Sequence, residues 1–390
     1  MLGMRIPTEG HPGVDPRAGR LQALDGLRGL SALTIAIIFH YRHFYAYGAQ
    51  PDPSWFTNPV MHPLVDQGAL AVNLFFVMSG VIFTHVYYEA VASQQISGRR
   101  FFMLRFARLY PLHLVTTVAM VFLTWGGLRA TGRLPLADLG ASDGYHLMLN
   151  LLMLQHIGLQ FGHSFNFVSW SLSIEAICYC LFFWVARRGL PFELACFALA
   201  TFGIYLMFGH VNALALSPET GQGLFGFFAG CLIARGFDTG LSVPITIAAA
   251  VLTAFSAATF VWGGRAVMPG SADPYFTVLV VILPSIVVLA LTVAPLRWLL
   301  SGWVGRKLGD LSFSIYMVHI SVQCAIIISA SLLGVGLPYD RWWFYAIYVA
   351  GVLGVAEFSY RTIERPAQRW IRTKYGRGIR PGRSSGQVPI

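Results

Sequence analysis

The sequence predicts an all-α polytopic membrane protein with about ten transmembrane helices and one short re-entrant or interfacial helix. Of its 390 residues, 56% are hydrophobic and only 11% are charged, whereas a soluble domain usually carries about 25% charged residues. A membrane span needs about 20 apolar residues, and apolar segments of this order recur along the whole chain. The composition therefore excludes a water-soluble globular protein and an intrinsically disordered chain.

Apolar segments define the predicted helices. In chain order they lie at 27–46, 67–90, 109–128, 145–158, 170–186, 190–209, 221–235, 243–262, 274–293, 311–333 and 342–360. The segment at 145–158 has only 14 residues, which is short for a hydrocarbon core of about 30 Å, so we expect it to be the re-entrant or interfacial helix. The other segments are the predicted spans. In one of them, Gly226 and Gly230 have the spacing that lets two helices approach closely.

The distribution of positive charge favours ten spans with both termini in the cytoplasm. Cytoplasmic loops of membrane proteins are enriched in Lys and Arg. This arrangement places the arginines at 99–108 on the same side as the C-terminal tail, which holds eight cations between Arg361 and Arg383. The formal net charge of +10 therefore indicates membrane topology and contact of the tail with lipid head groups, not binding to nucleic acid.

Three regions follow from this topology. Residues 1–24 are polar, lack the apolar core of a signal peptide and are predicted to form a cytoplasmic segment. Residues 25–366 form the transmembrane domain, and residues 367–390 form a basic cytoplasmic tail. Because no loop between spans exceeds about 40 residues, we expect any chemistry to take place within the helix bundle or at its mouths.

Ionisable side chains within spans are costly and therefore mark candidate functional sites. His40 lies twelve residues after Arg28, or ~18 Å along a helix, and Glu175 is expected at a similar depth, with His319 nearer the middle. A histidine paired with a carboxylate suits general-base chemistry on a hydroxyl, because the carboxylate fixes the tautomer of the imidazole. The alternatives are that His319 only hydrogen-bonds a neighbouring helix and that Glu175 is a protonated packing residue.

A second cluster contains Arg105 and Arg108, three residues apart on one face of the helix that enters the third span. One interpretation is a positive-inside topology signal. The other is a phosphate site, because the guanidinium fork matches phosphate oxygens. A cytoplasmic, phosphate-rich donor such as coenzyme A fits the second interpretation.

The five cysteines predict no metal site. All of them lie inside apolar runs and lack metal-ligand or disulfide spacing. They are Cys178, Cys180, Cys196, Cys231 and Cys324.

Six sequence blocks, in order, resemble the acyltransferase 3 family and together cover about residues 21–370. The blocks are LDGLRGL at 24–30 leading to His40, NLFFVMSG at 73–80, RFARLYP at 105–111, WSLSIE at 170–175, SFSIYMVH at 312–319 and YRTIERP at 360–366. Members of this family are integral membrane enzymes that move acetyl or similar acyl groups from acyl-CoA to hydroxyls of carbohydrates and other acceptors. The resemblance implies the stand-alone type, without an additional hydrolase-like domain.

The resemblance also implies roles for residues in these blocks. His40 and Glu175 would be catalytic, and Arg105, Arg108 and Arg28 would bind the donor. Supporting residues would be Asp25, Ser79, Trp170, Ser173, Tyr316 and His319. The expected donor is acyl-CoA, with acetyl, succinyl or a longer acyl group. The expected acceptor is a carbohydrate or glycolipid, and the expected location is a bacterial inner membrane.

The spacing in the first block departs from the family. Eleven residues separate Arg28 from His40, whereas the family usually has ten. One additional residue turns a side chain by about 100° on a regular helix, so we expect a local bulge or a shifted helix start. His43 is the alternative catalytic histidine.

Two other classes of function remain as alternatives. A proton-coupled transporter or permease also uses buried His and Glu residues, although no internal repeat typical of many transporters is evident. A non-catalytic sensor or scaffold would leave the ordered His, Glu and Arg blocks unexplained.

Overall fold

The computed structural model describes residues 16–46, 61, 65, 67–136, 139–160, 162–209, 213, 216–263 and 277–375. Within these ranges the protein is helical and forms no strand; one isolated bridge joins Ala213 and Leu216. The predicted all-α fold is therefore confirmed for this part of the chain. Residues 1–15 of the predicted N-terminal segment and 376–390 of the predicted tail lie outside the described residues.

The helical elements of the described residues fall into two groups in chain order. The first group is α1 (Pro16–Leu33), the π-helix η1 (Thr34–Phe39), the 3-10 helix η2 (His40–Arg42), α2 (His43–Ala46), η3 (Gly68–Leu70), α4 (Ala71–Ala92), α5 (Gly98–Val121), η4 (Phe122–Gly126), α6 (Gly127–Thr131) and α7 (Gly144–Leu151). The second group is η6 (Phe167–Ser169), α8 (Trp170–Arg187), α9 (Phe192–Phe208), α10 (Pro218–Asp238), α11 (Ser242–Gly263), η7 (Thr277–Ile282), α13 (Leu283–Thr292), α14 (Ala294–Leu300), α15 (Trp303–Leu333), α16 (Trp342–Ser359), η8 (Tyr360–Glu364) and α17 (Arg365–Tyr375).

Six helical stretches in the described residues are long and apolar enough to cross a membrane. They are Leu21–Tyr45, Gly68–Ala92, Gly98–Thr131, Phe167–Arg187, Trp303–Leu333 and Trp342–Tyr375. A seventh span results if η7–α13 and α14, bent by 89° at their junction, are counted as one. The predicted total of about ten spans is not confirmed. The short predicted helix corresponds to α7, whose eight residues reach only ~12 Å.

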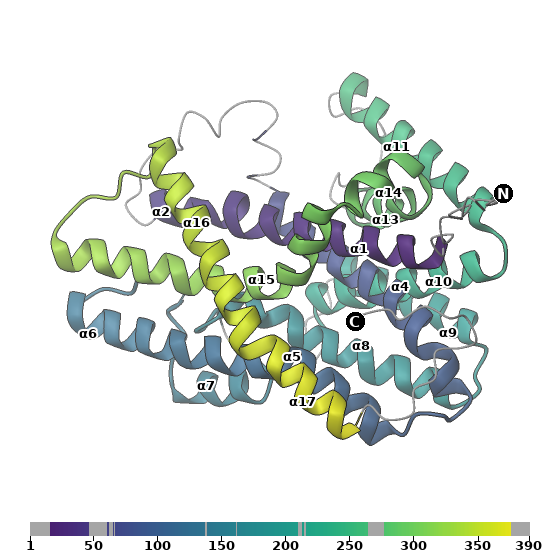
Figure 1. Ribbon diagram of the computed structural model, residues 1–390, viewed down its shortest axis with the longest axis horizontal. Helices are drawn as coiled ribbons and strands as arrows, with labels where there is room; N and C mark the ends of the chain where they lie inside the picture. The colour runs from purple at the N-terminus through teal and green to yellow at the C-terminus, as the bar shows by residue number, and fades with distance from the viewer. Residues whose placement is uncertain are drawn as a thin grey trace, which may run out of the picture.

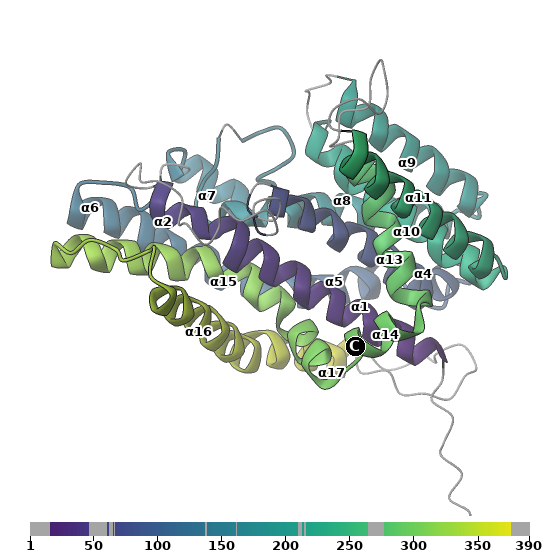
Figure 2. The same cartoon turned by 90° about the horizontal axis from the view of Figure 1, so that it is seen from above.

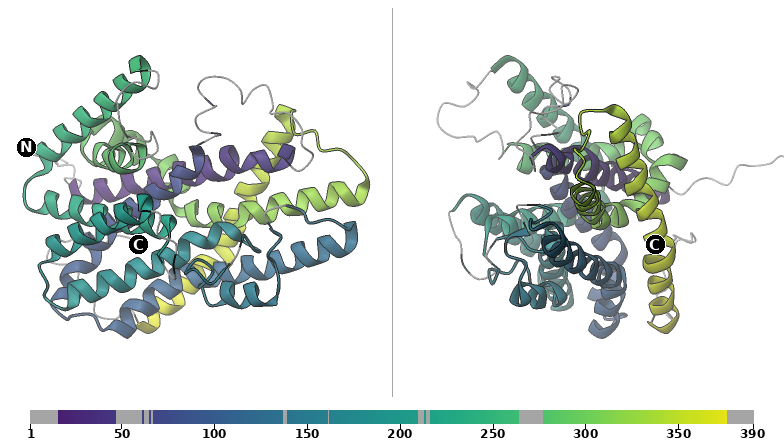
Figure 3. Two further views of the ribbon diagram at one scale, coloured as in Figure 1. Left: turned by 180° about the vertical axis from the view of Figure 1, so that it is seen from behind. Right: turned by 90° about the vertical axis from the view of Figure 1, so that its left-hand side faces the viewer.

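Helix α1 packs mainly on α15 and also on α4, α13 and α14. In Figure 1, α1, α8 and α15 run along the long axis of the molecule. From above, α1 lies between α15 and α16 on one side and α4 and α10 on the other (Figure 2). Helix α16 crosses one face obliquely, in front in Figure 1 and behind in the left view of Figure 3. This arrangement brings segments far apart in the sequence against the first span.

Side-chain caps set the starts of several helices. Ser97 and Ser217 precede α5 and α10, and each hydroxyl accepts a hydrogen bond from the backbone N–H three residues later. Asp143 caps α7 in the same way through the N–H of His146. Such caps satisfy backbone donors that have no partner within the helix.

Glycines allow two pairs of helices to pack with their backbones close together. A Cβ at Gly29 of α1 would overlap Leu308 and Gly309 of α15, and a Cβ at Gly230 of α10 would overlap the carbonyl of Val77 in α4. Close approach through small residues is a common way to join helices in membranes. The close contact predicted for Gly230 is therefore confirmed. The Gly29 contact joins α1 to α15 eleven residues before His40.

Candidate active site

The π-helix η1 lies between Arg28 and His40 and accounts for the unusual spacing. A π-turn holds one residue more than an α-turn, and η1 (Thr34–Phe39) ends immediately before His40. The additional residue of the first block is therefore taken up before the imidazole, as the spacing predicted. π-Bulges are frequent at functional sites.

His40 belongs to a cluster of buried imidazoles. Its Nδ1 lies 2.8 Å from Nε2 of His319, and its ring stacks on the rings of His319 and His43 with centroid distances of 5.0 and 5.1 Å. The amide of Gln323 joins the cluster: its Nε2 donates to the carbonyl of His40 over 2.8 Å, and its Oε1 lies 3.1 Å from Nδ1 of His43. Phe167 closes the cluster with its ring edge-on to His40 at 5.7 Å.

The hydrogen bonds determine which nitrogen of His40 carries the proton when the cluster is neutral. His319 Nδ1 lies 3.1 Å from the carbonyl of Ile315, and because a carbonyl only accepts, this nitrogen is protonated. Nε2 of His319 is then an acceptor, so His40 donates from Nδ1. This leaves the lone pair on Nε2 of His40, which has no hydrogen-bond partner among the described residues. An imidazole in this tautomer can take a proton from a hydroxyl.

Glu175 does not form the predicted pair with His40. Its Oε1 accepts hydrogen bonds from Ser79 over 3.1 Å and from Tyr179, one turn later on α8. The reason is helix placement: α8 turns Glu175 toward α4, while α15, held against α1, brings His319 to His40. His319, which was expected nearer the membrane middle than His40, is in direct contact with it.

Tyr316 and the start of α8 form a wall beside the imidazoles. The Tyr316 hydroxyl donates to the carbonyl of Val168 and lies 3.1 Å from the Ser171 hydroxyl. Its ring centroid lies 6.1 Å from that of His319. Ser173 is buried, and its hydroxyl has no partner among the described residues.

Arg108 is paired with a carboxylate that the sequence did not single out. It forms an ion pair with Glu364 of η8, whose side chain is only 1% exposed. Glu364 also accepts hydrogen bonds from Ser314 over 2.8 Å and from Gln368 over 3.1 Å. The ion pair joins η8 to α5, and both η8 and α17 pack on α5.

The other predicted donor-binding arginines lie near this pair but have different partners. Arg105 donates to the hydroxyl of Tyr87 and lies over the rings of Phe83 and Tyr87, 5.0 and 4.6 Å from their centroids. Arg28 lies 3.7 Å from Asp25 and interacts electrostatically with Arg108. Arg28 lies twelve residues before His40, or ~18 Å along a regular helix.

Glu364 and Gln323 are the principal site residues that sequence reasoning missed. Glu364 lies in the YRTIERP block, but its position beside a basic tail suggested a solvated segment. A single acidic residue among cations just after an apolar span was the available signal. Gln323 lies four residues after His319 and so on the same face of α15, which was the signal for that contact.

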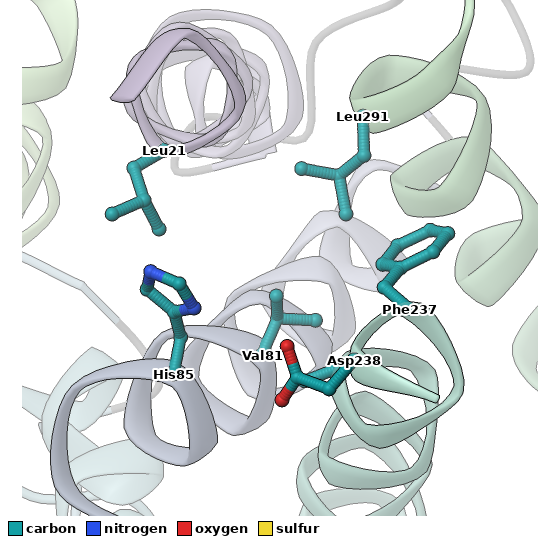
Figure 4. Close-up of a pocket in the computed structure, with 7 residues that line it drawn as sticks. Leu21, Val81, His85, Phe237, Asp238 and Leu291 are labelled. Atoms are coloured by element: carbon teal, nitrogen blue, oxygen red, sulfur yellow. The ribbon is translucent and has the colours of Figure 1, made fainter. Parts of the chain in front are cut away.

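A small cavity lies at the opposite end of α1 from His40. Its volume is about 50 Å³, and Figure 4 shows the His85 ring and the Asp238 carboxylate among apolar side chains from α1, α4, α10 and α13. The predicted site residues do not line it. Among the described residues, no group of three or more His, Cys, Asp or Glu side chains is placed to hold a metal ion.

The fold and the comparisons define the class of protein. The chain is a multi-pass helical membrane protein with a buried imidazole cluster and a group of arginines within its bundle. A family model described as "Acyltransferase domain", that of the acyltransferase 3 family, matches residues 21–360. The chain belongs to this family and is a membrane acyltransferase.

Relatives agree with this assignment. The chain is 25% identical to the acyltransferase MdmB of Streptomyces mycarofaciens over an alignment that covers 96% of this chain and 98% of the relative. It is 35% identical to protein 2 in the picA locus of Rhizobium radiobacter, but over only 26% of this chain and 44% of that protein. No solved structure matches.

Proposed function

We propose that the protein transfers an acyl group, acetyl in the simplest case, from acyl-CoA to a hydroxyl of a carbohydrate acceptor. The observation that carries the proposal is the 2.8 Å contact between Nδ1 of His40 and Nε2 of His319. With Nδ1 engaged in this way, Nε2 of His40 is available as a base.

His40 would act as the general base. Its Nε2 takes the proton of the acceptor hydroxyl while the hydroxyl oxygen attacks the thioester carbonyl. A C–O bond forms, the C–S bond breaks, and the coenzyme A sulfur leaves and takes the proton from the imidazolium. A route in which His40 carries the acyl group briefly uses the same nitrogen as nucleophile. The His319 ring, which accepts from Nδ1, keeps the base in the reactive tautomer in either route.

The donor would enter from the cytoplasmic end. Arg105, Arg108 and Arg28 lie toward that end of the bundle in the proposed topology, and guanidinium groups suit the phosphates of coenzyme A. Arg108 is already paired with Glu364, so a phosphate would have to share or replace that carboxylate. The reactive thioester would reach His40 through the bundle, since the pantetheine arm is narrow and flexible.

Glu175 would act at a distance from the base. It is fixed by Ser79 and Tyr179 and interacts electrostatically with Arg28 and with Tyr316. Glu175 thus interacts with one of the proposed donor-binding arginines and with Tyr316, whose ring centroid is 6.1 Å from that of His319. We therefore assign Glu175 to the path of the donor. The proposed location of the protein is a bacterial inner membrane, with both termini in the cytoplasm.

Two measurements test the proposal. Cell-surface glycans and secreted glycosides of a strain lacking the protein are compared with those of its parent by mass spectrometry. A missing acetyl or other acyl mass on a sugar supports the proposal, and identical glycan masses contradict it. Purified protein in liposomes then separates an enzyme from a carrier, because labelled acyl transfer supports the enzyme and solute accumulation without transfer supports a permease.

A further inference from the structure

The π-turn in the first span takes a backbone donor away from a buried carbonyl. The N–H of His40 donates to the carbonyl of Ile35, five residues earlier, whereas in a regular α-helix it would donate to the carbonyl of Ala36. Ala36 is fully buried, so water does not replace the lost donor. Because a buried carbonyl that loses a donor is costly, the π-turn is stabilised by any side chain that supplies one at this point.

Tyr348 of α16 supplies this donor. Its hydroxyl donates to the carbonyl of Ala36 over 2.7 Å. The Tyr348 side chain is fully buried, and its ring packs edge-on against Phe44 with centroids 5.1 Å apart. Tyr348 also interacts with the side chain of Gln323, which donates to the carbonyl of His40 over 2.8 Å. Side chains from α15 and α16 therefore hold the backbone at both ends of the segment 36–40.

The Tyr348 hydroxyl favours one of two helix registers at His40. Without this hydroxyl, the N–H of His40 would satisfy the carbonyl of Ala36 by returning to it, and the π-turn would become a regular turn. The one-residue shift would then pass to His40 and rotate its side chain by about 100°. A rotation of this size would take the His40 ring away from His319, with which it is now in contact over 2.8 Å. The π register therefore sets the direction of the imidazole.

We propose that Tyr348 is a positioning residue, which holds the π-turn before His40 and thereby directs the imidazole of the base. The inference rests on the proposed function and adds to it a residue that acts through the backbone of the first span. The alternative is that the Tyr348 hydroxyl only stabilises the packing of α16. The two roles are distinguishable, because the positioning role depends on the presence of the π-turn.

The test uses the full chain in lipid nanodiscs, with labelled acetyl-CoA and methyl glycosides of common hexoses as probe acceptors. Tyr348→Phe keeps the ring and removes the hydroxyl. It should lower kcat roughly tenfold, the effect of about one buried hydrogen bond, and leave the KM for acetyl-CoA unchanged. Tyr145→Phe is the matched control, because the Tyr145 hydroxyl on α7 also donates to a backbone carbonyl, that of Leu159 over 2.9 Å. The control should keep the wild-type kcat.

A chain that lacks Ile37 separates positioning from simple stabilisation. Deletion of Ile37 places the N–H of Tyr41 four residues after Ala36, so a regular helix can satisfy the Ala36 carbonyl without help. In this shortened chain, Tyr348→Phe should have almost no further effect on kcat. Hydrogen exchange of residues 34–41 gives a second measure that needs no acetyl transfer. In the chain that keeps Ile37, Tyr348→Phe should speed exchange in this segment and leave exchange in α7 unchanged.

An unchanged kcat in Tyr348→Phe would overturn the positioning role. An equal loss of kcat with and without Ile37 would also overturn it, because the hydroxyl would then act independently of the π-turn. If the shortened chain does not insert, hydrogen exchange decides, and unchanged exchange at 34–41 in Tyr348→Phe contradicts the proposal. Failure of the proposed function looks different: the wild-type chain would show no His40-dependent consumption of acetyl-CoA, while exchange would still respond to Tyr348→Phe.

Discussion

Replacing His319 by Phe tests how the base is held. His319 is fully buried and accepts from Nδ1 of His40 over 2.8 Å. Phenylalanine keeps a ring in this place but removes the acceptor, so the Nδ1 proton of His40 loses its partner. An unsatisfied buried donor costs about 1–3 kcal/mol, and His40 is 7% exposed, so water offers little compensation.

If that cost falls on the reactive tautomer, kcat should drop roughly 5- to 150-fold, the rate equivalent of about 1–3 kcal/mol. KM for acetyl-CoA should stay the same, because the partners of the proposed donor-binding arginines are Tyr87, Glu364 and Asp25 and not this pair. His319→Gln should recover a large part of the rate, since its amide oxygen can accept from Nδ1. The assay is transfer of labelled acetyl groups by protein in nanodiscs at saturating donor.

The reasoning about the tautomer is refuted if His319→Phe retains the wild-type kcat. It is equally refuted if the Gln and Phe variants are slowed to the same extent, because loss of shape alone would then explain the effect. Thermal unfolding of each variant separates a change in rate from a loss of folded protein.

The other predictions concern an ion pair, a π-turn and a helix cap. Arg108→Ala should destabilise the protein by about 3–5 kcal/mol, because it leaves Glu364, whose side chain is 1% exposed, buried without its partner. Adding Glu364→Gln to this variant should recover most of the lost melting temperature. If the double variant shows no recovery, the pairing is contradicted. Deleting Ile37 should convert η1 to a regular helix and keep His40 in place, so acetyl transfer should remain within a few-fold of wild type, whereas inserting a residue there should abolish it. Hydrogen bonds from the backbone N–H and ring of His146 lower the pKa of Asp143, so this cap stabilises α7 above the ordinary aspartate pKa of ~3.9 and is lost as the pH falls through the lowered value. Asp143→Ala should therefore speed hydrogen exchange in α7 at pH 7 but not near pH 2, and an equal effect at both would contradict the charge-dependent part.

Local features of the site could be predicted from the sequence, but contacts between distant helices could not. The additional residue between Arg28 and His40 predicted a bulge because a helix has a fixed rotation per residue, and η1 is that bulge. The spacing of Gly226 and Gly230 likewise predicted a close helix contact. Each of these inferences needs only one helix.

The partner of His40 depends on the register of two helices 279 residues apart in the sequence. The predicted topology placed His40 and Glu175 at a similar depth in the membrane, but it gave no information about which face of α8 carries Glu175. The burial of Glu364 required the C-terminal segment to fold back on α5, and a basic composition favoured solvent instead. Such contacts are set by packing, which a single sequence does not encode in its local pattern.

The most direct test of the account is the rate of acetyl transfer by His40→Ala in nanodiscs, compared with wild type and with His43→Ala. Removal of a general base typically lowers the rate ~10²–10⁴-fold. Replacing His43 should lower it much less, because His43 stacks on His40 but does not hydrogen-bond its Nδ1. The account predicts that His40→Ala inserts and melts like wild type but transfers acetyl groups at least ~10²-fold more slowly. A His40→Ala protein that transfers at the wild-type rate would contradict it.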